Sequence, residues 1–355
     1  MFPKNDWYMA CWSDELTDRP LGRTIAGEPL VLFRDGSGKV AALRDQCIHR
    51  GVSLSPGRIV RGSIECPYHG LVYDGTGRCV HIPTQDHIPT KAVVRSFAAR
   101  EQHAIVWVWA GKVEEADDSK IVPYPWHDDA RWPYRKGYLH VRCGYEMLLD
   151  NIMDLTHLPY VHPHTIGGGS EDDHIKAVMK TERTDRGVKF ARWLLDSVAP
   201  PMYTKVAGLK GKIDRWQEEE LIVPSVIVQF TGGVDVAQDA YHGGSRESGF
   251  GIRVLHAIVP ETDVTCHYFF SVALGSGPHD PAMMEALLKQ TLATLQEDVV
   301  ICEDQQSRMS QFPDTTLVDL RSDEARLLYR RHLVARVAAE RASDPENAPT
   351  VAFQR

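Results

Sequence analysis

The chain has 355 residues, enough for about two domains, and its 43% hydrophobic and 25% charged residues are the balance of an ordinary globular protein. Its 40 basic against 48 acidic side chains give a formal net charge of −8, which argues against nucleic acid as a partner. The apolar runs are far shorter than the ~20 residues that span a bilayer, and the N-terminus does not resemble a signal peptide. We therefore expect a cytoplasmic protein without membrane contact.

The first hundred residues have the pattern of β structure. Residues 29–43 predict a hairpin with the turn Asp35-Gly36-Ser37-Gly38, and residues 70–82 predict a second hairpin with the turn Asp74-Gly75-Thr76-Gly77. Residues 103–110 are apolar on both faces, as in a buried strand. An acidic stretch and two prolines follow and mark a domain boundary.

The rest of the chain mixes strands with helices. Residues 146–158 are rich in Leu, Met and Ile and predict a buried helix, which Pro159 should end or kink. The other predicted elements are strands at 137–145, 221–230, 250–259 and 264–274, and helices at 281–309 and 323–342. We expect one domain at 1–115, a linker at 116–126, a second domain at 127–345 and a loose C-terminus at 346–355.

A first group of possible metal ligands lies in the two turns of the β region. The chain reads Cys-x-His at Cys47 and His49, and Cys-x-x-His at Cys66 and His69. Two thiolates and two imidazoles suit either zinc or an iron–sulfur cluster. In a Rieske [2Fe-2S] centre the cysteines bind one iron and the histidines the other. Structural zinc sites usually keep their cysteines together and their histidines together, so the interleaved order favours the Rieske centre, with zinc as the alternative.

A second group begins in the predicted helix at 146–158. Asn151, Asp154 and His157 are spaced at i, i+3 and i+6 along one stripe of that helix, and a kink at Pro159 would bring His162 to the same metal. Two histidines and one carboxylate form the facial triad of non-haem Fe(II) oxygenases, which leaves positions open for O2 and substrate. The alternative is a pair of ordinary histidines without a metal.

The carboxylate of such a triad must come from elsewhere in the chain. The helix at 281–309 offers Glu297, Asp298, Glu303 and Asp304. Asp298 precedes an apolar run and should lie near the buried face, but spacing alone does not decide between Asp298 and Asp304.

With these motifs, the chain resembles the terminal oxygenase (α) subunit of Rieske non-haem iron oxygenases, in the monooxygenase branch typified by vanillate and dicamba O-demethylases. The pieces that carry the resemblance are both cysteine–histidine loops, the segment DNIMDLTH at 150–157 and the QED helix. The family implies an α+β chain, in which a β-rich Rieske domain precedes a helix-grip (START/Bet v1-like) catalytic domain.

The resemblance also implies roles for single residues. It implies His157, His162 and Asp298 as ligands of mononuclear Fe(II), and Cys47, His49, Cys66 and His69 as ligands of the cluster. Asp154 resembles the aspartate that links the iron site to His69 of a neighbouring subunit in a homotrimer, and we expect it to fix the tautomer of His157. Asn151 resembles the polar residue beside the iron.

The function implied is O2- and NAD(P)H-dependent O-demethylation of a methoxylated aromatic acid such as vanillate, with release of formaldehyde. Electrons would come from a separate ferredoxin-type reductase, in the bacterial cytoplasm. The alternative within the family is methyl hydroxylation, ring hydroxylation or cis-dihydroxylation of another aromatic acid, such as toluene sulfonate or phthalate. Outside the family, the alternatives are an electron carrier, which needs only the first domain, and a zinc-stabilised ligand-binding module. Arg192 and Arg215, each beside a tryptophan, are minor candidates for binding a substrate carboxylate.

Overall fold

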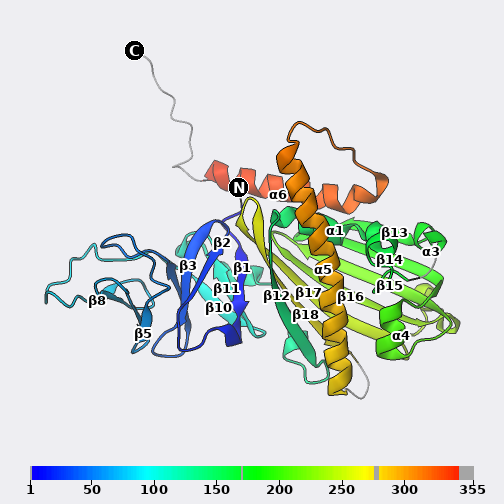
Figure 1. Cartoon of the computed structure of the whole chain (residues 1–355), viewed down its shortest axis with the longest axis horizontal. Coiled ribbons are helices and arrows are strands. Elements are labelled where there is room, and N and C mark those ends of the chain that lie inside the picture. Colours follow the sequence, from blue (N-terminus) through cyan, green and yellow to red (C-terminus); the bar gives the residue numbers. More distant parts are fainter. Residues whose placement is uncertain (1, 169–170, 276–279, 344–355) are drawn as a thin grey trace, which may run out of the picture. The chain divides into compact units, whose positions relative to one another are not determined.

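The computed structural model describes residues 2–168, 171–275 and 280–343, and the predicted loose C-terminus at 346–355 lies outside them (Figure 1). The chain forms two compact units. The first comprises the residues up to Ile121 and those from Arg330 onward, and the second is Val122–Tyr329. The domain limits given above remain a prediction, to which the structure adds that the end of the last helix belongs with the first unit.

The described residues of the first unit form three antiparallel sheets. In sheet order the strands are β1 (Trp7–Trp12), β11 (Ile105–Trp109) and β10 (Ala99–Gln102); β2 (Leu21–Ile25), β3 (Glu28–Arg34), β4 (Val40–Arg44) and β9 (Ser96–Phe97); β5 (Arg58–Val60), β6 (Ser63–Glu65), β7 (Val72–Tyr73) and β8 (Cys79–His81). Both predicted hairpins are confirmed, as β3–β4 and β7–β8. Their turns have the same design, because the carboxylates of Asp35 and Asp74 each accept a main-chain N–H two residues on, at 2.8 Å.

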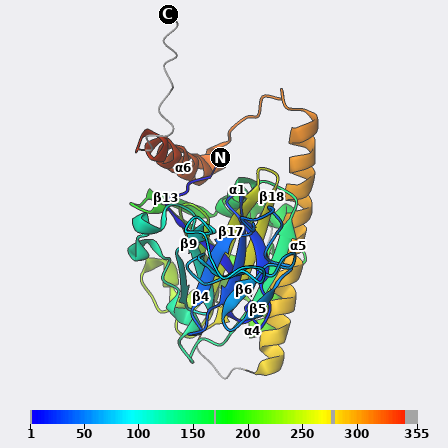
Figure 2. The ribbon, with the colours of Figure 1, turned by 90° about the vertical axis from the view of Figure 1, so that its left-hand side faces the viewer.

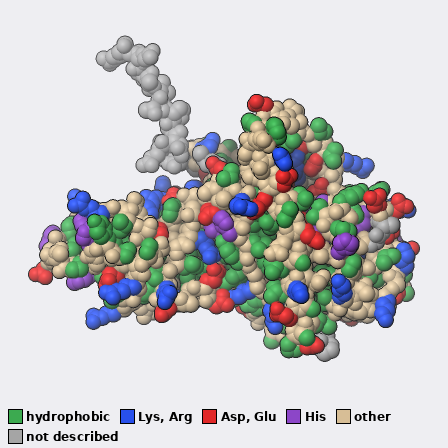
Figure 3. Space-filling view, in the orientation of Figure 1, with side chains coloured by type: hydrophobic (Ala, Val, Ile, Leu, Met, Phe, Trp, Pro, Cys, Tyr) green, Lys and Arg blue, Asp and Glu red, His purple; other side chains and the backbone are tan. Residues whose placement is uncertain are grey.

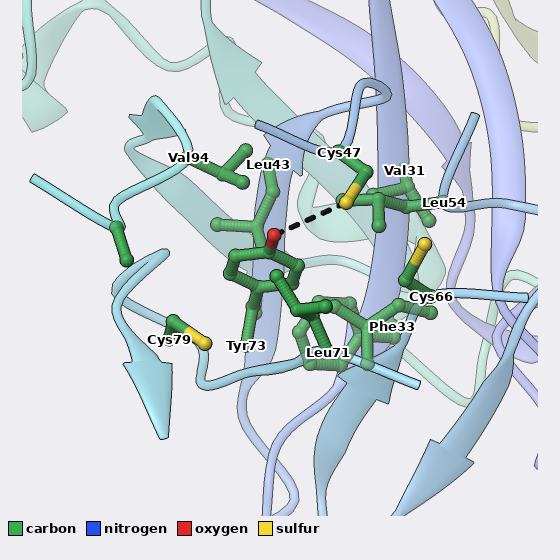
Figure 4. Packing of buried hydrophobic residues seen from close by; sticks show 13 residues of the cluster. Val31, Phe33, Leu43, Cys47, Leu54, Cys66, Leu71, Tyr73, Cys79 and Val94 are labelled. Atoms are coloured by element: carbon green, nitrogen blue, oxygen red, sulfur yellow. Dashed lines mark hydrogen bonds between the residues drawn. The ribbon is translucent and has the colours of Figure 1, made fainter. Parts of the chain in front are cut away.

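The core of the first unit includes both cysteines of the predicted cluster site (Figure 4). Cys47 and Cys66 lie among Val31, Phe33 and Leu54, and the predicted buried strand is confirmed as β11, which is buried along its whole length. All seven cysteines belong to the described part of the chain and are free thiols. The two cysteine loops are therefore anchored in the packed core of the first unit.

The second unit is built on one antiparallel sheet of seven strands. The strands, in sheet order, are β12 (Tyr134–Val141), β18 (Thr265–Leu274), β17 (Phe250–Thr262), β16 (Val226–Asp235), β15 (Lys212–Ile222), β14 (Gly187–Val198) and β13 (Val178–Arg183). The helices of the described residues are α1 (Tyr145–Met153), α2 (Leu158–Val161), α3 (Glu171–Ile175), α4 (Pro201–Ala207), α5 (Pro281–Gln311) and α6 (Glu324–Ser343), of which α6 belongs to the first unit from Arg330 onward. The 3₁₀ helices in the described part of the chain are Ser13–Glu15, Val113–Glu115, Asp118–Lys120, Pro125–His127, Leu155–His157, Val236–Gln238, Ala240–His242 and Arg321–Asp323.

Helix α5 covers one face of this sheet (Figures 1 and 2). Ile252 and Leu274 of the sheet pack in one core cluster with Met284 and Leu287 of the helix. The opposite face carries a second cluster, with Trp193 and Trp216. The sheet and its long covering helix agree with the helix-grip architecture expected from the sequence. No helix within the described ranges is both long and apolar enough to cross a membrane.

Two predicted elements are wrong in detail. The helix predicted at 146–158 ends at Met153, because Asp154 is extended (φ −126°, ψ 95°) and caps the following 3₁₀ turn. Pro159 then lies in the first turn of α2, where its missing N–H costs no hydrogen bond. The single strand predicted at 221–230 is the end of β15 and the start of β16, separated by a turn at Pro224, which has no N–H for the ladder.

Candidate functional site

Two loops of the same shape carry the Cys-x-His and Cys-x-x-His motifs. The N–H of Gly51 donates to the carbonyl of Cys47 (2.9 Å), and the N–H of Gly70 donates to that of Cys66 (3.1 Å). Gly51 and Gly70 have φ angles of +73° and +72°, which glycine adopts without the strain of a side chain. Each loop thus closes tightly on its cysteine.

The cysteines of these loops are buried, and the histidines are exposed. Cys47 and Cys66 are each 2% exposed. The rings of His49 and His69 lie 4.6 Å apart between centroids. Histidine side chains are visible at the surface at the end of the first unit that carries β5 and β8 (Figure 3). Two thiols toward the core and two imidazoles toward solvent are a donor set that fits a Rieske cluster, with the thiols on one iron and the imidazoles on the other.

The two thiols lie in a hydrogen-bonding environment. The Tyr73 hydroxyl is 3.2 Å from Cys47 Sγ (Figure 4). Burial and the neighbouring Cys47 raise the pKa of the Cys66 thiol, and the main-chain N–H groups of Tyr68 and His69 oppose that shift. Such donors stabilise thiolate and cluster sulfur. Tyr73 was not identified from the sequence, because one tyrosine in an apolar strand looks like a core residue.

In the second unit, His157, His162 and Asp298 converge. His162 Nε2 lies 3.2 Å from His157 Nε2 and 3.0 Å from Asp298 Oδ1, and His157 Nε2 lies 3.4 Å from the same oxygen. Three ligands at ~2.1 Å from one ion and at right angles to one another are ~3 Å apart, so this spacing suits a facial triad. The residues present therefore fit a mononuclear metal ion.

The protons on both imidazoles can be assigned from their partners. His157 Nδ1 is 2.6 Å from the main-chain carbonyl of Asp154, and His162 Nδ1 is 2.7 Å from Glu297 Oε2. A carbonyl or carboxylate oxygen only accepts, so both Nδ1 atoms carry the proton and both Nε2 lone pairs point into the site. Glu297, which the sequence offered only as a possible ligand, instead orients one; Thr165 donates to it at 2.9 Å.

Asp298 is ionised although it is only 5% exposed. Burial alone would raise its pKa, but the adjacent imidazoles of His157 and His162, which donate to it when they are doubly protonated, lower the pKa to about 2. Asn151 Nδ2 also donates to Asp298 Oδ1 (3.1 Å). Asp304 is exposed and pairs with Arg308, so the structure brings Asp298, and not Asp304, to the histidines.

Asp154 does not hold His157 in the way expected. Its main-chain carbonyl, rather than its carboxylate, accepts the hydrogen bond from His157. Carboxylate Oδ1 accepts from the N–H (3.0 Å) and the hydroxyl (2.7 Å) of Thr156, and Oδ2 accepts from Ser322 (3.3 Å). The carboxylate thus caps the 3₁₀ turn that presents His157.

A second group of side chains of the types that can bind a metal lies elsewhere in this unit. His140 Nε2 is 2.6 Å from Glu261 Oε2, and His267 Nε2 is 3.9 Å from Glu261 Oε1. The sequence did not predict this group, because no motif joins residues so far apart. An ordinary histidine–carboxylate pair accounts for it, and we assign it no function.

Comparison with known proteins identifies both units. Residues 6–97 match the Rieske [2Fe-2S] domain, and residues 141–339 match the vanillate O-demethylase oxygenase C-terminal domain. The chain is 34% identical over 325 residues to the iron-sulfur subunit of the toluene-4-sulfonate monooxygenase system of Comamonas testosteroni, covering 91% of this chain and 93% of that one. It is 34% identical over 347 residues to the vanillate O-demethylase oxygenase subunit of Pseudomonas sp. (strain HR199 / DSM 7063), covering 96% of both chains.

The solved structures agree. A crystal structure of dicamba monooxygenase bound to 3,6-dichlorosalicylic acid superposes with a TM-score of 0.90 at 32% identity, covering 97% of this chain and 99% of that one. The chain therefore belongs to the Rieske non-haem iron oxygenases, the monooxygenase components that work with a Rieske [2Fe-2S] cluster, non-haem iron and a separate electron-supplying partner.

Proposed function

We propose that this chain is the oxygenase component that O-demethylates a methoxylated aromatic acid such as vanillate, using O2 and electrons from NAD(P)H and releasing formaldehyde. One observation carries the proposal: three ligand atoms of a facial triad converge in a chain that also pairs two cysteine–histidine loops. An electron carrier would need only the loops, so the triad argues for oxygen chemistry.

Each proposed ligand set belongs to one unit. The proposed cluster ligands are Cys47, His49, Cys66 and His69, and the proposed Fe(II) ligands are His157, His162 and Asp298. When bound, the cluster supplies single electrons and the iron activates O2, so that one oxygen atom enters a substrate C–H bond.

The protein's own groups prepare this chemistry. Glu297 and the Asp154 carbonyl hold the protons of the two imidazoles at Nδ1, and Asn151 orients Asp298. Because these groups are fixed before the substrate arrives, little reorganisation is needed at the moment of reaction. Full burial of His162 excludes water from its side of the site.

The second candidate is hydroxylation of another aromatic acid, such as toluene sulfonate or phthalate, at a methyl group or the ring, including cis-dihydroxylation. One observation favours it: the toluene-4-sulfonate relative is as similar to this chain as the vanillate relative. Oxygen insertion into a methoxy group gives a hemiacetal, which falls apart to a phenol and formaldehyde. The same insertion into a ring methyl group gives a stable alcohol, so the products separate the candidates.

The test is turnover with a compatible reductase on vanillate, syringate, methoxybenzoates, toluene-4-sulfonate and phthalate. Products are identified by mass spectrometry, and formaldehyde is assayed. We expect formaldehyde from at least one methoxy compound. Hydroxylated toluene-4-sulfonate or phthalate without formaldehyde from any methoxy compound would establish the second candidate. A colourless protein without iron would refute both.

We further propose a homotrimer in which Asp154 meets His69 of the partner subunit. In support, His69 is exposed and the Asp154 carboxylate is only partly buried. Sedimentation of the purified chain should give three copies. Co-expressing Cys66→Ser chains, which lack the cluster, with Asp298→Ala chains, which lack the iron, should restore turnover if electrons pass between subunits. Mixed assemblies as inactive as either variant alone would refute this. We place the reaction in the cytoplasm, because seven free thiols suit a reducing compartment.

A further inference from the structure

Two arginines are buried in the second unit on the sheet face that α5 covers. Arg192 is 0% and Arg215 is 2% exposed. Arg192 on β14 is opposite Gln217 on β15, and that cross-strand row continues through Thr231 to Ile252. Residues directly opposite one another point to the same face, and Ile252 packs in the core cluster with α5. The guanidinium groups therefore lie inside the unit, not against its outer tryptophans.

Among the residues that the structure describes, every hydrogen-bond partner of these two side chains is uncharged. Arg192 donates to Gln217 Oε1 (3.2 Å), to the His174 carbonyl (3.2 Å) and to His174 Nδ1 (3.1 Å). Arg215 donates to the Gly167 carbonyl (3.2 Å). The Nε atoms of both arginines are buried without a partner, and neither arginine forms an ion pair with a carboxylate of the described residues.

The imidazole of His174 does not compensate the positive charge of the two arginines. Its Nδ1 accepts from Arg192 and its Nε2 donates to the Gly168 carbonyl (2.8 Å), which is the pattern of a neutral ring. Burial and the two arginines lower the pKa of His174, as this neutral state requires. The histidine therefore orients Arg192 without compensating its charge.

The nearest acids leave positive charge in excess. Burial lowers the pKa of Arg192 to about 10, so the group still carries its charge at neutral pH. Glu219 lies diagonally opposite on β15, but burial raises its pKa to about 8, so it is mainly uncharged. Asp154 attracts Arg192 without forming an ion pair with it. Two adjacent buried cations without a carboxylate partner are costly in the absence of an anion.

This excess charge lies beside the predicted iron site. The N–H of Gly167 donates to the carbonyl of His162 (2.8 Å), and the carbonyl of Gly167 accepts from Arg215. One peptide loop therefore links an iron-ligand candidate to the arginine pair.

We propose that Arg192 and Arg215 form the binding site for the sulfonate or carboxylate group of the aromatic substrate and so select anionic aromatics. The planar guanidinium fork matches such oxyanions in shape as well as in charge. Binding the acidic group there leaves the far end of the ring, with its methyl or methoxy group, to face the triad. This inference rests on the proposed function for its substrate class.

The first test uses the wild-type holoenzyme. Toluene-4-sulfonate and 4-methoxybenzoate are compared with the uncharged 4-tolyl methyl sulfone and methyl 4-methoxybenzoate, by calorimetric titration and by thermal stabilisation. We expect the anions to bind at least roughly 30-fold more tightly, because loss of one partner of a buried charged pair has at least that effect. Equal affinity for charged and neutral members would overturn the proposal without any variant.

The second test uses Arg192→Gln and Arg215→Gln, with Arg253→Gln as the matched control. Arg253 stacks on Phe230 and Trp126 and takes no part in the proposed site. Arg192→Gln and Arg215→Gln should each weaken anion binding by roughly 30-fold or more. The affinity for the neutral analogues should stay within about threefold of the wild-type value. In the control variant, any change in affinity should be the same for anionic and neutral compounds. An equal loss of affinity for anionic and neutral compounds in Arg192→Gln or Arg215→Gln would overturn the proposal.

The two proposals can fail separately. If anions bind only when both arginines are present, yet no compound is turned over, the anion site stands and the proposed function fails. If methoxy compounds are demethylated with no preference for the anion, the function stands and the anion site fails.

Discussion

The most informative single change is Asp154→Asn, compared with Asp154→Ala. The carboxylate does two things at once: it caps the 3₁₀ turn of His157 through Oδ1, and it supplies a negative charge on the proposed electron path. Asparagine keeps an oxygen for the cap but loses the charge, whereas alanine loses both. The pair of variants therefore separates a structural role from an electronic one.

The magnitudes follow from those contacts. Asparagine caps about as well as aspartate, so its effect on the free energy of unfolding should be small. Loss of the cap in the alanine variant should cost about 1 kcal/mol, or about 2–4 °C of melting temperature in a unit the size of Val122–Tyr329. We expect turnover of the asparagine variant to fall roughly 10–100-fold with both metals retained.

The assay measures three quantities on the same preparations: iron per chain, thermal stability, and the rate at which the pre-reduced cluster is reoxidised by O2 with substrate present. The asparagine variant should keep wild-type iron and stability while reoxidation slows. Near-normal demethylation in that variant would refute the electron-path role. Slow reoxidation and iron loss confined to the alanine variant would show that the carboxylate acts mainly by holding the turn.

Three further changes test other contacts. Glu297→Gln weakens the acceptor that holds the proton of His162 at Nδ1, so iron affinity should fall roughly 10–100-fold in a competition titration with a chelator; unchanged affinity would contradict the tautomer argument. Gly70 has a φ angle of +72°, and Gly70→Ala would place a Cβ 3.0 Å from a proline ring carbon, so this variant should have reduced cluster absorbance. The control is Gly38→Ala, where φ is +82° and no atom lies within 4 Å of the added Cβ. It carries only the backbone strain and should keep the cluster. Burial raises the pKa of Asp150 to about 7. Between about pH 4 and pH 7 the folded chain therefore keeps a proton on Asp150 that the unfolded chain loses. The free energy of unfolding should fall over this range as the pH rises, by on the order of 4 kcal/mol. Denaturant melts of Asp150→Asn should lack this fall, and an identical pH profile in both proteins would contradict it.

Local chemistry made the first unit predictable. The Asp-Gly turns at Asp35 and Asp74 and the apolar strand β11 are short-range signals, and the structure has all three. The ligand candidates Cys47 and Cys66 could be named for the same reason, since each lies in a motif a few residues long. The break at Asp154 was missed, because a side chain that caps the next turn looks, in sequence, like one more residue of a polar stripe.

Long-range features were harder to predict. Strands β13 and β14 were not identified, because exposed Lys180 and Glu182 and buried Arg192 blur the apolar alternation of a half-buried strand. The choice of Asp298 over Asp304 depended on which face of α5 meets the sheet, which a helix of low amphipathicity does not reveal. The partnership of Arg192 and Arg215 depends on strand register, which no local motif encodes.

The triad draws two donors from one short segment and the third from a helix much later in the chain. During synthesis, His157 and His162 emerge together and, as proposed metal ligands, would form an incomplete chelate, in which zinc and copper are favoured over iron. Only when α5 has been made and docked does Asp298 complete the set. If these three residues hold the iron, as proposed, selection of that ion is completed only after α5 has docked.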